Sequence, residues 1–150
     1  MTESTGVWQV LKDLAPDLGI RMERLEVRGR AGVPDVLWVH TSGVVGRIEL
    51  KLLRPGRWFE KRPPIKKLGV RAPQAIALRH WTAAGGRGGV LVREMHPESR
   101  AQDRWWYMPA HPTEGWVRSI LSDRWGDAAL PEAGTRATLS DWLFRSLMPQ

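Results

Sequence analysis

The 150-residue sequence has no cysteine, no run of 18 apolar residues and no targeting segment at its start. The first absence excludes disulfide bonds, zinc–thiolate sites and iron–sulfur clusters. The second predicts that no helix crosses a membrane. The third concerns residues 1–5, which lack the basic start and apolar stretch of a secretory signal peptide. Together these absences predict a cytoplasmic protein with no membrane partner.

Several widespread catalytic patterns are also missing. The sequence has no Gly-rich phosphate loop, no dinucleotide-binding fingerprint and no nucleophile elbow. Its four histidines lack the spacing of metal ligands, which argues against zinc. The length is that of one domain, so we expect a single domain over residues 1–150.

Positive charge is concentrated in one part of the chain. The formal net charge is +7, and residues 47–79 hold ten basic and two acidic side chains. That segment therefore carries +8, and the remainder of the chain sums to −1. A clustered basic patch is typical of a protein that binds a polyanion, and DNA is the expected partner. The alternative is a basic loop that only interacts with solvent.

A β-hairpin is predicted on either side of a turn at residues 41–43. Runs rich in β-branched side chains flank this turn, and its third residue is Gly43. Glycine tolerates the left-handed conformation that a three-residue hairpin loop requires at this position. The predicted register pairs His40 with Val44.

This register places Asp35 opposite Glu49, and Lys51 projects from the same face of the sheet. Two directly opposed like charges destabilise a sheet, so the arrangement predicts a divalent cation between them. Mg²⁺ takes carboxylate and carbonyl oxygens and keeps several water ligands. Lys51 would orient a nucleophile or stabilise developing negative charge.

The same residues resemble a known nuclease motif. Pro34-Asp35, a gap of 13 residues and then Glu49-Leu50-Lys51 resembles the PD-(D/E)XK pattern. Gln74, on a predicted helix that ends at a Gly-Gly pair before a strand, is similar to its counterpart in the VRR-NUC and Holliday junction resolvase branches. The resemblance covers residues 1–94.

The resemblance implies a restriction-endonuclease-like fold. This is an α/β core of order αβββαβ, in which helices flank a mixed sheet. It also implies hydrolysis of phosphodiester bonds with Mg²⁺ or Mn²⁺ as cofactor. Asp35, Glu49 and the Leu50 carbonyl would hold the metal, Lys51 would assist the attacking water, and Gln74 would support the site.

The resemblance implies two further sets of residues. A carboxylate of the first helix often completes the metal site; Glu3 is the candidate and Asp13 the fallback, although Glu3 is equally explained as a charge at a helix N-terminus. The other set comprises the basic residues expected to contact DNA: Arg28, Arg30, Arg54, Arg57, Lys61, Arg62, Lys66, Lys67 and Arg71.

Periodicity and turn signals predict the remaining elements. In the core these are a helix at 2–14 broken at Pro16, a strand at 20–27 with a bulge between 22 and 25, a helix at 72–84 with His80 packed, and a strand at 88–94. Residues 95–150 form a C-terminal extension with an edge strand at 104–108, a helix at 113–125 and a last helix that begins near 138–140.

Nine tryptophans, five of them in the extension, predict a large aromatic core and a homodimer interface. The expected function is a structure-selective endonuclease acting on branched, junction or flap DNA. One alternative is a restriction-type enzyme that reads a short duplex sequence. Another is a non-catalytic nucleic-acid-binding module with the same fold.

Overall fold

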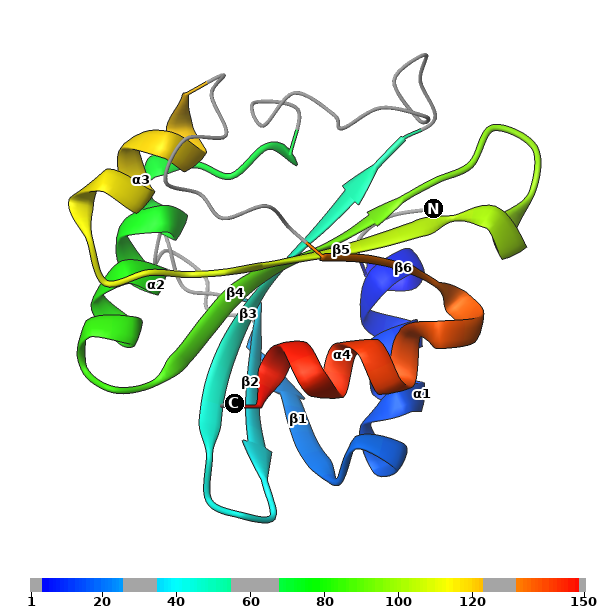
Figure 1. Cartoon of the computed structure of the whole chain (residues 1–150), viewed down its shortest axis with the longest axis horizontal. Coiled ribbons are helices and arrows are strands. Elements are labelled where there is room, and N and C mark those ends of the chain that lie inside the picture. The colour runs from blue at the N-terminus through cyan, green and yellow to red at the C-terminus, as the bar shows by residue number, and fades with distance from the viewer. Residues whose placement is uncertain (1–3, 26–34, 55–67, 123–131, 149–150) are drawn as a thin grey trace.

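In the computed structural model, residues 4–25, 35–54, 68–122 and 132–148 are described, and they form a mixed β-sheet covered by helices on both faces (Figure 1). The expected α/β class is therefore confirmed. The elements in chain order are a π-helical turn η1 (Ser4–Trp8), α1 (Gln9–Leu18), β1 (Ile20–Arg24), β2 (Val36–His40), β3 (Val45–Leu53), α2 (Ala72–Ala83), β4 (Arg87–Glu94), the 3-10 turn η3 (Arg100–Gln102), β5 (Arg104–Pro109), α3 (Glu114–Leu121), β6 (Glu132–Thr135), the 3-10 turn η4 (Arg136–Thr138) and α4 (Leu139–Leu147).

The described strands lie in the sheet in the order in which they occur in the chain, from β1 to β6. All neighbours are antiparallel except β3 and β4, which run parallel and are joined through α2. A parallel pair needs a long crossover, and the helix supplies it. The predicted order of helix, three strands, helix and strand is confirmed.

Two hydrophobic cores lie on the two faces of the sheet. One packs β-strand side chains such as Trp38 and Ile48 against η1, α1 and α4. The other packs residues such as Val90 and Val92 against α2 and α3. Because α4 and α1 share the first core, the C-terminal extension packs directly on the N-terminal part of the chain.

The prediction that β5 is an edge strand is wrong, because β6 pairs with it and Trp105 lies opposite Gly134. The sequence of β6, Glu-Ala-Gly-Thr, has no β-branched alternation and so gives little strand signal.

The predicted helix at 113–125 is also shorter than expected. Thr113 accepts a hydrogen bond from the Trp116 backbone at 3.2 Å as its N-cap, but the helix ends at Leu121, where Ser122 takes an extended backbone.

The predicted break at Pro16 is wrong too. The helix continues through Pro16 to Leu18 and ends at Gly19, whose φ of 66° is left-handed. The Gly19 backbone N–H caps the carbonyl groups of Ala15 and Pro16. Leu14 and Leu18 are both buried, so packing of the apolar stripe outweighs the hydrogen bond that proline forfeits.

Strand β1 contains no bulge between residues 22 and 25. Pairing with β2 is regular to Arg24, and the Leu25 N–H donates to the Asp35 carbonyl at 2.7 Å beyond it. Regular alternation makes Arg24 half-buried like Met22, because the aliphatic stem of the arginine can pack beneath its charged group. Residues 26–27 of the predicted strand lie outside the described residues.

His80 is exposed on α2, so its predicted packing is wrong. Ile76, which was expected on the apolar face of this helix, is 42% exposed. In contrast, four of the seven tryptophans within the described residues are buried in the core, as predicted: Trp38, Trp105, Trp116 and Trp142. These side chains fill the core of one chain, and the homodimer stays a prediction. Within the described ranges, none of the helices is long and apolar enough to span a membrane.

Candidate active site

The β2–β3 hairpin has the predicted register. The His40 backbone N–H donates to the Val44 carbonyl at 2.8 Å, and Gly43 has a φ of 91°. Val36 pairs with Ile48, as the turn geometry requires. The two strands therefore bring residues 35 and 49 to the same place through local interactions alone.

Asp35 lies just before β2, where its carboxylate reaches the neighbouring strand. Its Oδ2 accepts a hydrogen bond from the Leu50 backbone N–H at 2.9 Å. The Asp35 backbone carbonyl accepts a hydrogen bond from the Leu25 N–H, so both the side chain and the backbone of Asp35 are held in place. The side chain is half-buried and lies close enough to Glu49 to influence its ionisation.

Glu49 is 2% exposed, in the middle of β3. Burial, and then the negative charge of Asp35, raises the pKa of Glu49 to about 8, while Lys51 acts in the opposite direction. Its Oε2 is buried and has no hydrogen-bond partner within the described ranges. An uncompensated buried oxygen beside a second carboxylate is the arrangement that a cation would stabilise.

Lys51 and Gln74 complete the cluster. The Lys51 Nζ lies 3.5 Å from Glu49 Oε1 and donates to Gln74 Oε1 at 3.2 Å. Gln74 Nε2 donates to the same Glu49 oxygen at 2.7 Å. Gln74 Oε1 also accepts from the Arg71 backbone N–H at 2.9 Å, which ties the first turn of α2 to the cluster.

The structure therefore brings together four of the five predicted catalytic residues, on the sheet face covered by α2 and α3. Glu3, the fifth, lies outside the described residues. Asp13 is exposed on α1 and accepts a hydrogen bond from Gln9 at 3.3 Å, and no described contact joins it to the cluster.

Of the predicted DNA contacts, only Arg54 and Arg71 are described. Both are exposed, Arg54 directly after β3 and Arg71 directly before α2, so they flank the carboxylates. The other predicted contacts lie outside the described residues: Arg28, Arg30, Arg57, Lys61, Arg62, Lys66 and Lys67.

Arg47 is a further residue of this site that was not predicted from the sequence. Its guanidinium carbon lies 4.6 Å from the centroid of the Trp81 ring on α2, on the same face as Glu49 and Lys51. The strand periodicity could have identified Arg47, because alternate strand residues such as 47, 49 and 51 lie on one face of the sheet. This stacking fixes a second cation beside the carboxylates.

The residues fit a hard cation held by few protein ligands. Within the described part of the chain, no group of three His, Cys, Asp or Glu side chains could hold a metal. The available donors are the carboxylates of Asp35 and Glu49 and the Leu50 carbonyl. Oxygen donors of this kind suit Mg²⁺ or Mn²⁺, which keep several water ligands, and do not suit zinc.

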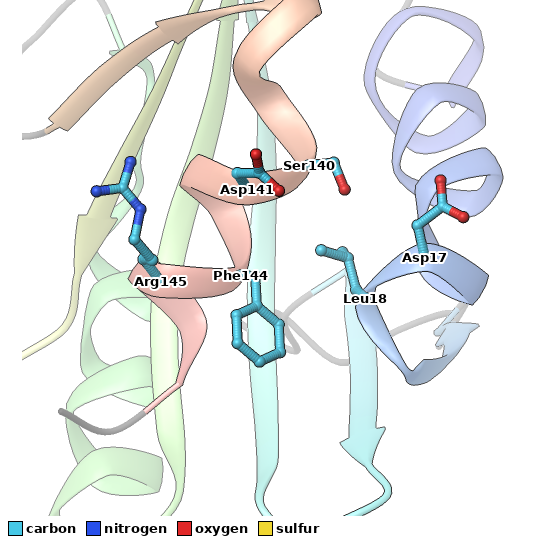
Figure 2. Close-up of a pocket in the computed structure, with 6 residues that line it drawn as sticks. All are labelled: Asp17, Leu18, Ser140, Asp141, Phe144 and Arg145. Carbon is cyan, nitrogen blue, oxygen red and sulfur yellow. The ribbon is translucent and has the colours of Figure 1, made fainter.

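A cavity of about 400 Å³ lies elsewhere, between α1 and α4 (Figure 2). Asp17 and Leu18 line it from α1; Asp141, Phe144 and Arg145 line it from α4. None of these residues belongs to the carboxylate cluster, so this cavity is separate from the candidate active site.

No protein-family model matches the sequence, and no curated protein matches it. Among solved structures, the chain is similar to one described as a VRR_NUC domain, with 23% identity and a TM-score of 0.43. The similarity covers 61% of this chain and 85% of that chain. A likeness of this degree does not indicate an activity.

Proposed function

We propose that this chain is a divalent-metal-dependent endonuclease of the PD-(D/E)XK type that hydrolyses phosphodiester bonds in DNA. The observation that supports the proposal is the contact network among Asp35, Glu49, Lys51 and Gln74. Two acids, one cation and one amide lie together, from β3, from α2 and from the residue just before β2. The half-buried Lys51 and the buried Glu49 are costly to retain for folding alone.

Each residue has a proposed role in phosphoryl transfer. Asp35, Glu49 and the Leu50 carbonyl would hold the cofactor, which when bound polarises the phosphate and lowers the pKa of a water ligand. Lys51 would orient the attacking water and stabilise negative charge on the phosphate as one P–O ester bond breaks. Gln74 would position both Glu49 and Lys51, since its amide contacts both side chains.

The proposed substrate is branched, junction or flap DNA. Support comes from the +8 segment, which begins within β3 and continues past the cluster. Arg54 and Arg71 are exposed at the ends of the elements that carry the cluster, and they would contact phosphates beside the scissile bond. Phosphate contacts of this type position DNA without reading its sequence, which fits selection by shape.

The deciding experiment is cleavage of a labelled panel: a four-way junction, a flap, a linear duplex and a single strand. Each is incubated with Mg²⁺, Mn²⁺ or EDTA. We expect metal-dependent cleavage that falls by about a hundredfold or more in Lys51→Ala and in Asp35→Asn, because each change removes a charge at the reacting phosphate.

Matched controls are Lys12→Ala and Asp141→Asn, which alter exposed residues outside the cluster and should cleave like the unmodified protein. Cleavage by Asp35→Asn at the unmodified rate would contradict the proposal. A discrete fragment pattern from plasmid DNA would indicate a restriction-type enzyme. Salt-sensitive binding without cleavage of any substrate would indicate a non-catalytic module.

A further inference from the structure

A second polar cavity, of about 200 Å³, lies at the other end of the central strands. It begins where β4 begins: Arg87 pairs with Gly46, whereas Val90 pairs with Glu49. The start of β4 is therefore three residues along the strand from the level of Glu49, a distance of roughly 10 Å. The lining includes Thr82 of α2, Arg87 of β4, Tyr107 of β5, His111 in the connection after β5, and Ser146 of α4.

Tyr107 supplies a buried donor to this cavity. The residue is 2% exposed and lines the cavity. Burial raises the pKa of Tyr107, so the phenol keeps its proton and remains a donor. Gly89 leaves room for the phenol, because a Cβ added at Gly89 would lie 2.3 Å from the hydroxyl oxygen. A ligand in the cavity could accept a hydrogen bond from this hydroxyl.

Arg87 supplies a positive charge with unused donors. Its Nε donates to the Leu147 carbonyl at 3.3 Å, and its own carbonyl accepts from Trp81 Nε1 at 2.7 Å. These two contacts anchor the residue between α2 and α4. No carboxylate pairs with it among the described residues, and no carboxylate lines the cavity. The two remaining guanidinium nitrogens are available to an oxyanion.

The other polar groups narrow the ligand chemistry. The Thr82 hydroxyl donates to the Leu78 carbonyl at 2.9 Å, and the Ser146 hydroxyl donates to the Trp142 carbonyl at 3.0 Å. Each hydroxyl can therefore only accept a hydrogen bond from a ligand. The Nε2 of His111 is buried without a partner within the described ranges. A ligand therefore meets a guanidinium, a phenol and an imidazole beside two acceptors.

We propose that this cavity is a phosphate-binding site, distinct from the nuclease cluster. A tetrahedral phosphate presents oxygens to Arg87 and Tyr107, and near pH 6 it retains a P–OH that can donate to Thr82 or Ser146. A carboxylate could satisfy the donors but has no proton for the two acceptors. The phosphate is either inorganic or the terminal monoester of a nucleotide or DNA end.

The test is calorimetric titration of the full chain with inorganic phosphate at pH 6 in EDTA, which prevents cleavage. We expect saturable binding that weakens by about tenfold or more in Tyr107→Phe, because one charge-assisted hydrogen bond is lost. Arg87→Gln should abolish binding. Arg136→Gln removes an exposed arginine outside the cavity and should bind like the unmodified protein.

Two measurements keep the result interpretable. The thermal midpoint without phosphate reports whether each variant folds; if Arg87→Gln does not, Tyr107→Phe and His111→Gln carry the test. Equal phosphate affinity in these variants and the unmodified protein, or no binding of phosphate to the unmodified protein, would overturn the proposal.

A second experiment identifies the source of the phosphate. A 5′- or 3′-phosphorylated oligonucleotide that binds more tightly than its hydroxyl form, with the difference lost in Tyr107→Phe, identifies a DNA end as the source. Binding of inorganic phosphate without that difference identifies the free anion.

Discussion

The amide of Gln74 does three things at once. It donates to Glu49, accepts from Lys51 and accepts from the backbone of Arg71 at the start of α2. A side chain of lower polarity could pack here, but it could not hold an acid and a cation at fixed distances. The geometry of the two charged groups therefore depends on one neutral residue.

Replacing Gln74 with alanine should lower turnover more than DNA binding. We expect kcat to fall on the order of ten- to a hundredfold with little change in KM, because misplaced catalytic groups slow the chemical step. Loss of the α2 capping contact should also cost about 1 kcal/mol of unfolding free energy. Single-turnover kinetics and urea unfolding measure the two effects. Gln102→Ala, at an exposed glutamine, is the control.

The raised pKa of Glu49 predicts how stability depends on pH. The folded value of about 8 exceeds the ordinary 4.5, so between these values the folded state binds more protons than the unfolded state. The stability conferred by the neutral carboxyl is complete below about pH 4.5 and is lost as pH rises through 8. In EDTA, the free energy of unfolding should fall by on the order of a few kcal/mol between pH 4.5 and pH 8.

Urea unfolding from pH 5 to 8 measures this dependence. Glu49→Gln should flatten it, because the variant has no carboxyl to ionise at this position. Mg²⁺ should restore stability at pH 8 in the unmodified protein and not in Glu49→Gln. A stability that rises steadily with pH in EDTA would contradict the assignment.

At the scale of elements, a buried ion pair joins the N-terminal turn to the β4–β5 hairpin. Arg93 Nε contacts Asp103 Oδ2 at 2.9 Å, and its Nη1 donates to the Gly6 carbonyl in η1 at 2.6 Å. Asp103 also accepts from the His96 backbone N–H at 2.6 Å. These contacts hold η1 against the sheet although 87 residues separate Gly6 from Arg93.

Asp103→Ala should destabilise the fold by about 3–5 kcal/mol, because it leaves the buried Arg93 charge without its partner. The midpoint of urea unfolding should fall accordingly. Glu98→Ala, at an exposed acid on the same connection, should change stability by less than about 0.5 kcal/mol. Similar midpoints for the two variants would show that the ion pair contributes little.

At the scale of the whole molecule, charge is distributed unevenly. The net +7 comes from the segment that begins beside the carboxylates. Two basic residues of this segment, Arg54 and Arg71, are described and exposed at the ends of β3 and α2. We therefore expect a polyanion to bind beside the carboxylates. Binding of this kind releases counterions and weakens as salt increases.

Arg71→Ala should reduce DNA affinity similarly for all sequences and lower the slope of log affinity against log salt by about 1. Fluorescence anisotropy over a series of salt concentrations, in EDTA, measures this slope. Arg136→Ala removes the same charge at a distant exposed position and should leave it unchanged. Equal slopes for both variants would remove Arg71 from the DNA-binding surface.

The amino-acid sequence by itself determined the hairpin, and with it the meeting of Asp35 and Glu49. A glycine turn and period-2 alternation are local properties, so the register follows from neighbouring residues. Helix α2 and the position of Gln74 in its first turn were predictable for the same reason.

Only the tertiary structure decided how these elements combine. It placed β6 beside β5, carried α1 through Pro16, turned Arg24 inward and left His80 exposed. It also enclosed Tyr107 beside Arg87. Each outcome depends on contacts between segments far apart in the chain, and side-chain periodicity within one segment does not encode which distant surface will cover it.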